Sequence, residues 1–222
     1  MAEPITTIEV PVPVARSPIR PLGPVRVVDG WERSGRPGGA GLRLCDLSHL
    51  AKVQLRARSG GAAAGELRVP AGRASRDHPT RRLVVGSGPG EWLVIGPTGA
   101  APGLVGELEG RLSAGTAGGE LVSVVDLTHG RALVRLSGTD AVGGVLAKLC
   151  PVDLAERAAP DGTALRTSMA GVVTDLVRDD VAGEVSYLLH CERSSGQYLF
   201  EVLLDAGAAH AIYAHGATDK DW

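Results

Sequence analysis

The sequence repeats one short phrase, Asp46-Leu47-Ser48-His49 and Asp126-Leu127-Thr128-His129, at an interval of 80 residues. The first copy is followed by a run in which apolar and polar residues alternate strictly, over 51–57, and the second by a nearly similar run over 131–136. Alternation of this kind is typical of a strand with one buried face and one wet face. The repeated phrase predicts two related halves. Four matching residues, one of them a Ser matched to a Thr, can also arise by chance in a chain rich in leucine and alanine, so the order of the elements has to support the predicted repeat.

The predicted elements follow the same order after each copy of the phrase. The first half has strands at 42–46, 51–57, 81–85 and 91–95, a degraded helix at 60–64 and a helix at 103–113. The second half begins with strands at 121–127 and 131–136 and continues with a helix at 140–149 whose N-cap is Thr139, strands at 171–178 and 184–191, and a helix opened by a Ser194-Ser195-Gly196-Gln197 capping box. The order strand, helix, strand, strand, helix is that of a split βαβ unit. We therefore predict an α+β fold of two pseudo-repeated ferredoxin-like halves with antiparallel sheets, over 41–120 and 121–222.

The first 40 residues have a different composition from the rest of the chain. Seven of the 14 prolines fall within the first 37 residues, and each removes a backbone donor and favours extended backbone. We expect residues 1–40 to form an extended proline-rich arm. It is either a disordered tail or a strap that lies across a partner subunit.

Composition excludes several classes of partner. Twenty-three basic residues stand against 25 acidic ones, and the few aromatic residues offer little for base stacking, which argues against nucleic acid. The apolar runs are too short for a membrane span. Three cysteines without a C-x-x-C pair, together with the absence of a signal peptide pattern, lead us to expect a cytoplasmic protein.

The search for chemistry-bearing motifs finds little. The sequence lacks a phosphate-binding loop before a helix and a G-x-S-x-G nucleophile turn. Cys45 and His49 could bind a metal only if two further ligands came from elsewhere, and His190 and Cys191 should point to opposite faces of a strand. His215 lies in the terminal tail. We expect no catalytic residue and no metal site.

Five residues at the two phrases remain as site candidates: Asp46, His49, Asp126, His129 and Arg131. One interpretation is structural, because Asp and Ser or Thr commonly fix a turn by accepting backbone N–H groups. The other is functional: Asp126, His129 and Arg131 line a cleft between the halves and hold a polar ligand or a partner's charged residue.

Several stretches of the chain resemble the gamma subunit of heterotetrameric sarcosine oxidase. The resemblance covers about residues 42–207, and its motifs are fold motifs. The stretches are 44–55, Gly88-Pro89-Gly90-Glu91-Trp92-Leu93, His129-Gly130-Arg131, Leu149-Cys150-Pro151-Val152-Asp153-Leu154 and Tyr187-Leu188-Leu189.

The resemblance implies a fold similar to the folate-using aminomethyltransferases of the glycine cleavage system. It also implies an assembly with alpha, beta and delta subunits that oxidises sarcosine to glycine, hydrogen peroxide and either formaldehyde or 5,10-methylenetetrahydrofolate. FAD, FMN, NAD, zinc and tetrahydrofolate are then expected in the partner subunits. The Asn-Glu-Tyr signature of the folate-using relatives is not found here, so no folate-binding residue is carried over.

These implications lead us to expect a non-catalytic structural subunit. The alternative is a stand-alone tetrahydrofolate-binding one-carbon transferase or sensor, and a regulatory domain unrelated to folate is a third possibility.

Overall fold

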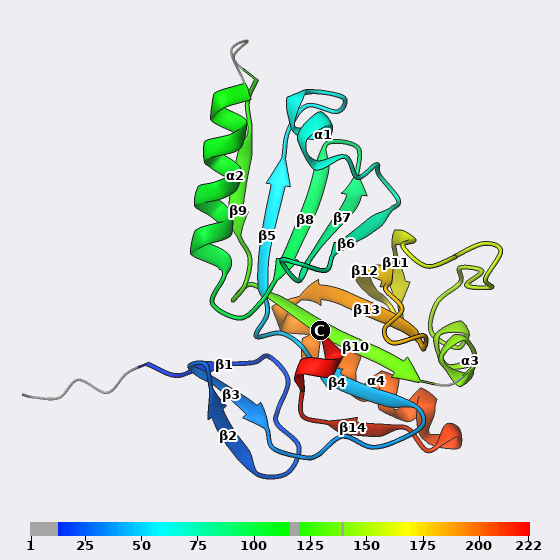
Figure 1. Ribbon diagram of the computed structural model, residues 1–222. Helices are drawn as coiled ribbons and strands as arrows, with labels where there is room; N and C mark the ends of the chain where they lie inside the picture. Colours follow the sequence, from blue (N-terminus) through cyan, green and yellow to red (C-terminus); the bar gives the residue numbers. More distant parts are fainter. Residues whose placement is uncertain (1–12, 116–119, 139) are drawn as a thin grey trace, which may run out of the picture.

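The computed structural model describes residues 13–115, 120–138 and 140–222 of the chain (Figure 1). Within these residues the fold is α+β, with sheets of five, six and three strands in which most neighbouring strands are antiparallel. The five-stranded and six-stranded sheets form two lobes, and the small sheet lies near the second lobe (Figure 1). The predicted α+β class with antiparallel sheets is confirmed at this level.

The first lobe contains the five-stranded sheet, in the order β6-β7-β8-β5-β9. Helix α2 (Ala101–Gly115) packs on it through Leu104, Leu108 and Leu112, which are all buried, as their four-residue spacing predicts. The bounds of the remaining elements are β5 Ala51–Arg56, α1 Ala62–Leu67, β6 Ala74–Asp77, β7 Arg82–Gly88, β8 Glu91–Gly96 and β9 Ser123–Asp126.

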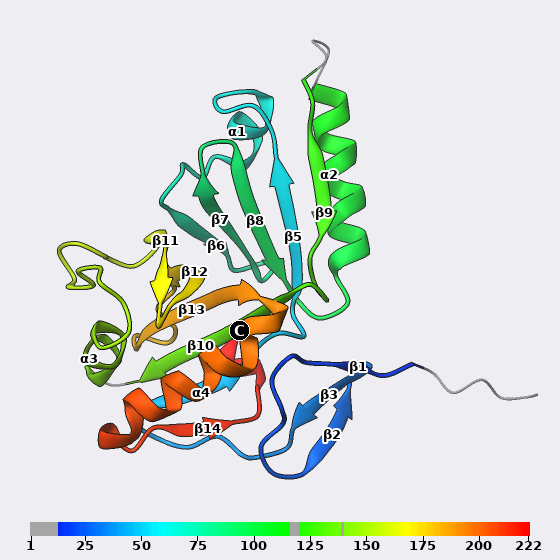
Figure 2. The same cartoon turned by 180° about the vertical axis from the view of Figure 1, so that it is seen from behind.

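The second lobe contains the six-stranded sheet, in the order β11-β12-β13-β10-β4-β14. Helices α3 (Ala141–Ala147) and α4 (Gly196–Gly207) share one apolar core with it, and α4 crosses in front of the sheet in Figure 2. The strand bounds are β4 Arg43–Asp46, β10 Arg131–Gly138, β11 Ala164–Met169, β12 Val172–Arg178, β13 Val185–Glu192 and β14 Tyr213–His215.

Each lobe completes its sheet with a strand from the other part of the chain. Strand β4 directly precedes β5 in sequence but pairs with β10, and β9 directly precedes β10 but pairs with β5. The strand orders β6-β7-β8-β5-β9 and β11-β12-β13-β10-β4 therefore correspond position by position. The two repeated phrases are the connections at which the chain crosses from one sheet to the other.

The described part of the predicted arm, residues 13–40, contains a small sheet. Its strands are β1 Ala15–Arg16, β2 Val25–Val28 and β3 Trp31–Ser34, in the order β1-β3-β2. Ile19 is buried in the core of the second lobe beside Phe200 of α4, so this segment is packed onto the domain. Residues 1–12 lie outside the described residues.

Two local predictions are wrong. Ser195 precedes α4 without a side-chain cap, because a short 3-10 turn (Arg193–Ser195) leads into the helix, and Gln197 instead accepts the Arg20 N–H at 2.7 Å. Lys52 does not face solvent, as strict alternation implies, but is fully buried. The other proposed cap, Thr139, lies outside the described residues.

In the part of the chain that the structure describes, no helix is both long enough and apolar enough to cross a bilayer.

Candidate functional site

The two repeated phrases form matching turns. The Ser48 N–H donates to Asp46 Oδ1 at 2.9 Å, and the Thr128 N–H donates to Asp126 Oδ1 at 2.8 Å. Each carboxylate thereby fixes the two-residue turn that follows its strand. This is the contact that the structural interpretation of the two aspartates predicts.

The hydroxyl groups of the two phrases accept hydrogen bonds where the chain crosses between the two sheets. Ser48 Oγ accepts the Leu133 N–H at 3.1 Å, and Thr128 Oγ1 accepts the Lys52 N–H, also at 3.1 Å. Two backbone bonds accompany them, from Leu47 N–H to Leu133 O and from Leu127 N–H to Lys52 O, both 2.8 Å long. Each phrase therefore satisfies buried backbone groups of the strand that follows the other phrase, which joins the two lobes.

The two histidines of the phrases lie in different surroundings. His49 is buried, and burial lowers its pKa to about 3, with the nearby Arg33 and Lys52 acting in the same direction. It is therefore a neutral imidazole. His129 is exposed, and its ring stacks on Trp31 of β3 with centroids 4.8 Å apart.

The candidate trio of the second phrase is divided among different partners. Asp126 holds the Thr128 N–H, His129 stacks on Trp31, and Arg131 forms an ion pair with Glu192 at 2.6 Å. These contacts account for all three side chains through the fold itself.

Asp46 and His49 do share a cavity, with Trp31 and Arg33 in the same lining. Its volume of about 20 Å³ has room for about one water molecule. Burial raises the pKa of Asp46, although hydrogen bonds from Ser17 and Ser48 oppose that rise. The cavity is too small for a pterin or an amino acid. His49 also lines a separate, more open groove of about 590 Å³, together with Arg33 and Arg81.

Lys52 is a buried charged group that sequence patterning missed. Its Nζ donates to Ser48 O and Leu50 O, each at 2.7 Å. Burial lowers its pKa to about 7, although the carboxylates of Asp46 and Asp126 oppose the shift. Lys52 therefore holds the turn of its own phrase closed by bonding two of its carbonyl oxygens.

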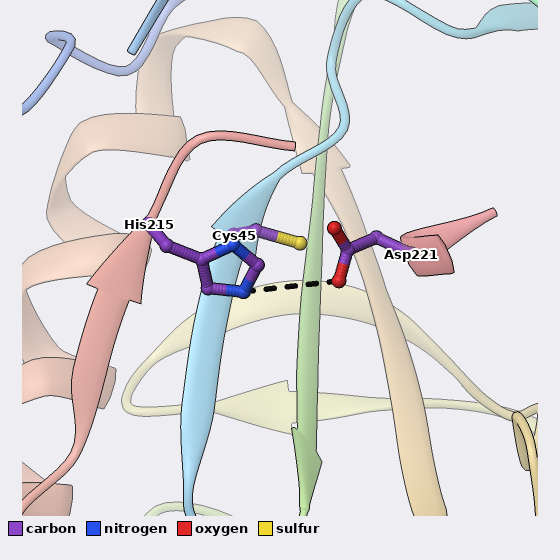
Figure 3. Close-up of side chains that lie close together, drawn as sticks. All are labelled: Cys45, His215 and Asp221. Carbon is purple, nitrogen blue, oxygen red and sulfur yellow. Dashed lines mark ion pairs between the residues drawn. The ribbon is translucent and has the colours of Figure 1, made fainter. Parts of the chain in front are cut away.

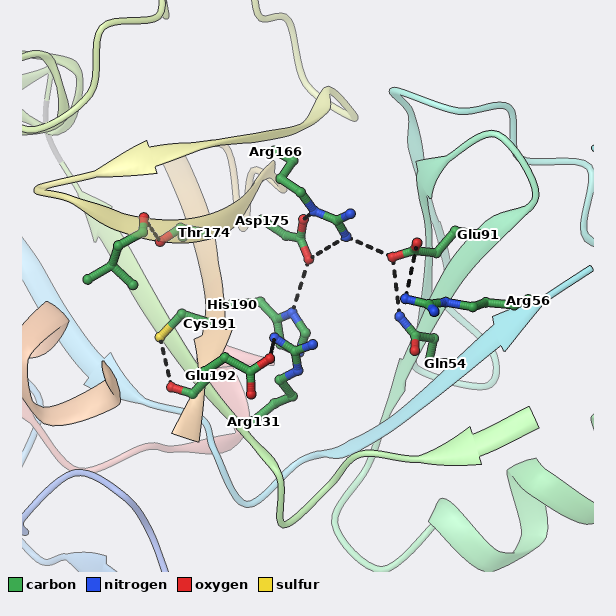
Figure 4. A network of polar contacts seen from close by, with 11 residues as sticks. Gln54, Arg56, Glu91, Arg131, Arg166, Thr174, Asp175, His190, Cys191 and Glu192 are labelled. Atoms are coloured by element: carbon green, nitrogen blue, oxygen red, sulfur yellow. Dashed lines mark hydrogen bonds and ion pairs between the residues drawn. The ribbon is translucent and has the colours of Figure 1, made fainter. Parts of the chain in front are cut away.

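A second polar network bridges the two lobes (Figure 4). Arg166 of β11 donates to Asp175 at 2.6 Å and reaches across to Glu91 of β8 at 2.7 Å. Burial alone would raise the pKa of Asp175, but hydrogen bonds from His190 and Arg166 outweigh it and leave that pKa below its usual value. The network joins the six-stranded sheet to the five-stranded sheet through the contact of Arg166 with Glu91.

The fold defined by these two lobes is shared with known proteins. The chain superimposes on the aminomethyltransferase T of the glycine cleavage system from Bartonella henselae with a TM-score of 0.66 and 16% identity, over 87% of this chain and 55% of that one. This likeness places the chain in the same fold class as that protein, and at 16% identity it supports the fold alone.

The chain is also similar to sarcosine oxidase chains, and the resemblance to their gamma subunit is confirmed. It matches the heterotetrameric sarcosine oxidase from Corynebacterium sp. U-96, solved in complex with pyrrole 2-carboxylate, with a TM-score of 0.65 and 27% identity over 79% of this chain and 89% of that one.

Two curated relatives carry the name sarcosine oxidase subunit gamma. The protein from Arthrobacter sp is 41% identical over 100 residues, which are 45% of this chain and 44% of the relative. The protein from Corynebacterium sp. (strain P-1) is 36% identical over 119 residues, 54% of this chain and 53% of the relative. The alignments thus span about half the length of the curated relatives. No protein-family model matches the sequence.

Proposed function

We propose that this chain is the gamma subunit of a heterotetrameric sarcosine oxidase and that it supports assembly without taking part in the chemistry. The similarity to a chain of a solved heterotetramer over 89% of that chain carries the proposal. The candidate polar residues agree with it, because the fold itself engages them: Asp46 and Asp126 fix the two turns between the lobes, and Arg131 pairs with Glu192 within the second lobe. The corresponding strand orders of the two lobes further support the proposal that the lobes are a ferredoxin-like pseudo-repeat.

The reaction in this proposal belongs to the other chains. The alpha, beta and delta subunits would hold FAD, FMN, NAD, zinc and tetrahydrofolate. The complex would convert sarcosine to glycine, with hydrogen peroxide and either formaldehyde or 5,10-methylenetetrahydrofolate as the further products. For this chain the proposal assigns no catalytic residue.

Strand β2 offers a surface for a partner chain. It is an edge strand of the small sheet, and Val25 and Val27 are 55% and 60% exposed. An exposed apolar edge strand favours pairing with another chain. We assign this edge to contact with another subunit of the complex, which corresponds to the second interpretation of the N-terminal segment, a strap that lies across a partner subunit.

Co-expression tests the proposal. The tagged chain is produced with candidate alpha, beta and delta chains from the same organism, and the captured material is examined for its bands, its visible spectrum and peroxide formation from sarcosine. A yellow four-chain complex that makes peroxide is expected. A colourless lone chain would contradict the proposal.

A pair of variants tests the assigned edge in the same experiment. Val25→Glu/Val27→Glu should reduce capture of the partners, whereas Val173→Glu, on an exposed valine of β12, should leave capture unchanged. Equal capture by both variants would remove β2 from the interface.

The folate-binding alternative makes a different prediction for the isolated chain. It requires saturable binding of tetrahydrofolate that is lost in Asp126→Ala or Arg131→Ala. A calorimetric titration without heat and without a rise in melting temperature would rule it out.

A further inference from the structure

Three side chains with metal-binding atoms converge in the second lobe (Figure 3). Cys45 lies on β4, His215 on β14, and Asp221 in the 3-10 turn Asp219–Asp221. Strands β4 and β14 are parallel neighbours in which His215 is directly paired with Cys45. One thiol sulfur, one imidazole nitrogen and one carboxylate oxygen lie within 4.8 Å of one another, and all three residues are buried.

The hydrogen bonding of His215 leaves one ring nitrogen without a partner. Nδ1 lies 2.8 Å from the carbonyl oxygen of Gly216, and because a carbonyl only accepts, Nδ1 must carry a proton. Nε2 is buried without a hydrogen-bond partner among the described residues and lies 3.7 Å from Asp221 Oδ1. In a neutral imidazole the Nε2 lone pair would face the Asp221 carboxylate, an arrangement that a bound cation would stabilise.

Asp221 is oriented in the way expected of a metal ligand. Its Oδ2 accepts the Thr218 N–H at 2.8 Å and the Thr218 hydroxyl at 2.7 Å, whereas Oδ1 is directed at His215. Outer hydrogen bonds of this kind commonly hold metal-binding histidines and carboxylates in place. The backbone carbonyl at Nδ1 and the threonine at Oδ2 would supply that support here.

We propose that Cys45, His215 and Asp221 bind a divalent transition-metal ion of the Zn²⁺ class. Sulfur, imidazole nitrogen and carboxylate oxygen are the donors that Zn²⁺ takes, and three protein ligands leave a fourth tetrahedral position. A thiolate and a carboxylate together balance the charge of the ion. The site is independent of the proposed assembly role.

Binding requires the Cys45 thiol to lose its proton. Burial raises the pKa of this thiol well above its usual value, and the nearby Asp221 adds to the rise, so without metal the sulfur is protonated. On binding, the S–H bond breaks, a sulfur–metal bond forms and the proton passes to solvent; no redox change occurs.

The site has an entry path. His215 and Asp221 both line a groove of about 700 Å³, together with Arg43, Arg135 and Lys220. The fourth position would therefore be open to water. Arg43 and Arg135 of this groove are already paired, with Glu184 and Asp179.

Cobalt substitution of the isolated full chain tests the proposal, which avoids any metal held by partner chains. Titration with Co²⁺ should give one equivalent bound, with thiolate-to-cobalt charge-transfer absorption and tetrahedral visible bands. Cys45→Ser should abolish the charge-transfer absorption, and His215→Gln and Asp221→Asn should lose binding. Thr218→Val should weaken it about 10–100-fold.

Cys150→Ser is the matched control, because Cys150 is also a buried free cysteine and its sulfur contacts the Thr167 hydroxyl. It should bind Co²⁺ as the parent chain does. If Cys45→Ser fails to fold, the His215 and Asp221 variants still decide the question. A parent chain that takes up no Co²⁺ or Zn²⁺, or one that binds equally well in all variants, overturns the proposal.

Discussion

The two copies of the repeated phrase use their shared residues alike in two positions and differently in a third. In both, the aspartate fixes a turn and the hydroxyl accepts a backbone N–H from the other half of the chain. The histidines differ, since His49 is buried and His129 is exposed and stacked on Trp31. The aspartate and the hydroxyl thus make the same contacts at both connections between the lobes, whereas the surroundings of the histidine depend on what covers it.

The largest expected difference between the copies concerns their nearby cations. Lys52→Ala should lower the free energy of unfolding by about 3 kcal/mol, because two buried carbonyl oxygens lose their donor and a cavity remains. Arg131→Ala removes a partly exposed ion pair with Glu192 and should cost about 0.5 kcal/mol. Urea unfolding of both variants measures the difference. Equal losses would contradict the contrast.

The pH dependence of the free energy of unfolding should report the burial of His49. The pKa of His49 is lowered from 6.5 to about 3 by burial, so between those pH values the unfolded chain binds a proton that the folded chain does not. Stability from this residue is fully present above pH 6.5 and falls as the pH drops toward 3, by up to about 1.4 kcal/mol per pH unit. His49→Gln should flatten the profile in this window relative to the parent. An unchanged slope would show that His49 is accessible to protons.

The hydroxyl groups should behave alike. Ser48→Ala and Thr128→Val each leave one backbone N–H at the crossing without its acceptor, and each should lower the free energy of unfolding by about 1–2 kcal/mol. Ser123→Ala, at an exposed position of β9, should have almost no effect. Thermal or urea unfolding of the three variants would detect an asymmetry, which would argue that one phrase alone joins the lobes.

The smallest predicted effect is the ring contact of the second copy. A double-mutant cycle with Trp31→Leu and His129→Ala should give a coupling of about 0.5–1 kcal/mol, typical of stacked rings. Zero coupling would mean that the contact does not anchor the N-terminal segment.

Much of the fold could be predicted from apolar periodicity. The strands β5, β8, β12 and β13 and the helix α2 agree with their predicted positions. Strand β6 and strand β11 were missed because Ala74–Asp77 and Ala164–Met169 are mainly polar or small. The exchange of β4 and β9 was also missed, since a local pattern indicates a strand but not its pairing partner.

The contacts of the candidate residues could be predicted only where they are local. The aspartate turns span two residues and follow from residue type. The alternating pattern places Lys52 on the solvent-facing side of its strand. The residue is buried instead, because its burial depends on the other half of the chain, which a local pattern does not show. His215 was set aside as a tail residue, although β14 places it against Cys45, 170 positions earlier in sequence.

Turnover per flavin in the purified complex tests the proposal that this chain assembles a sarcosine oxidase without catalysing its reaction. The complex is prepared with the parent chain, with Asp126→Asn/Arg131→Ala and with Val25→Glu/Val27→Glu. Peroxide formation per flavin should be the same in all three, while the yield of complex should fall for the β2 variant alone. Intact assembly with lower turnover per flavin in the Asp126 and Arg131 variant would contradict it.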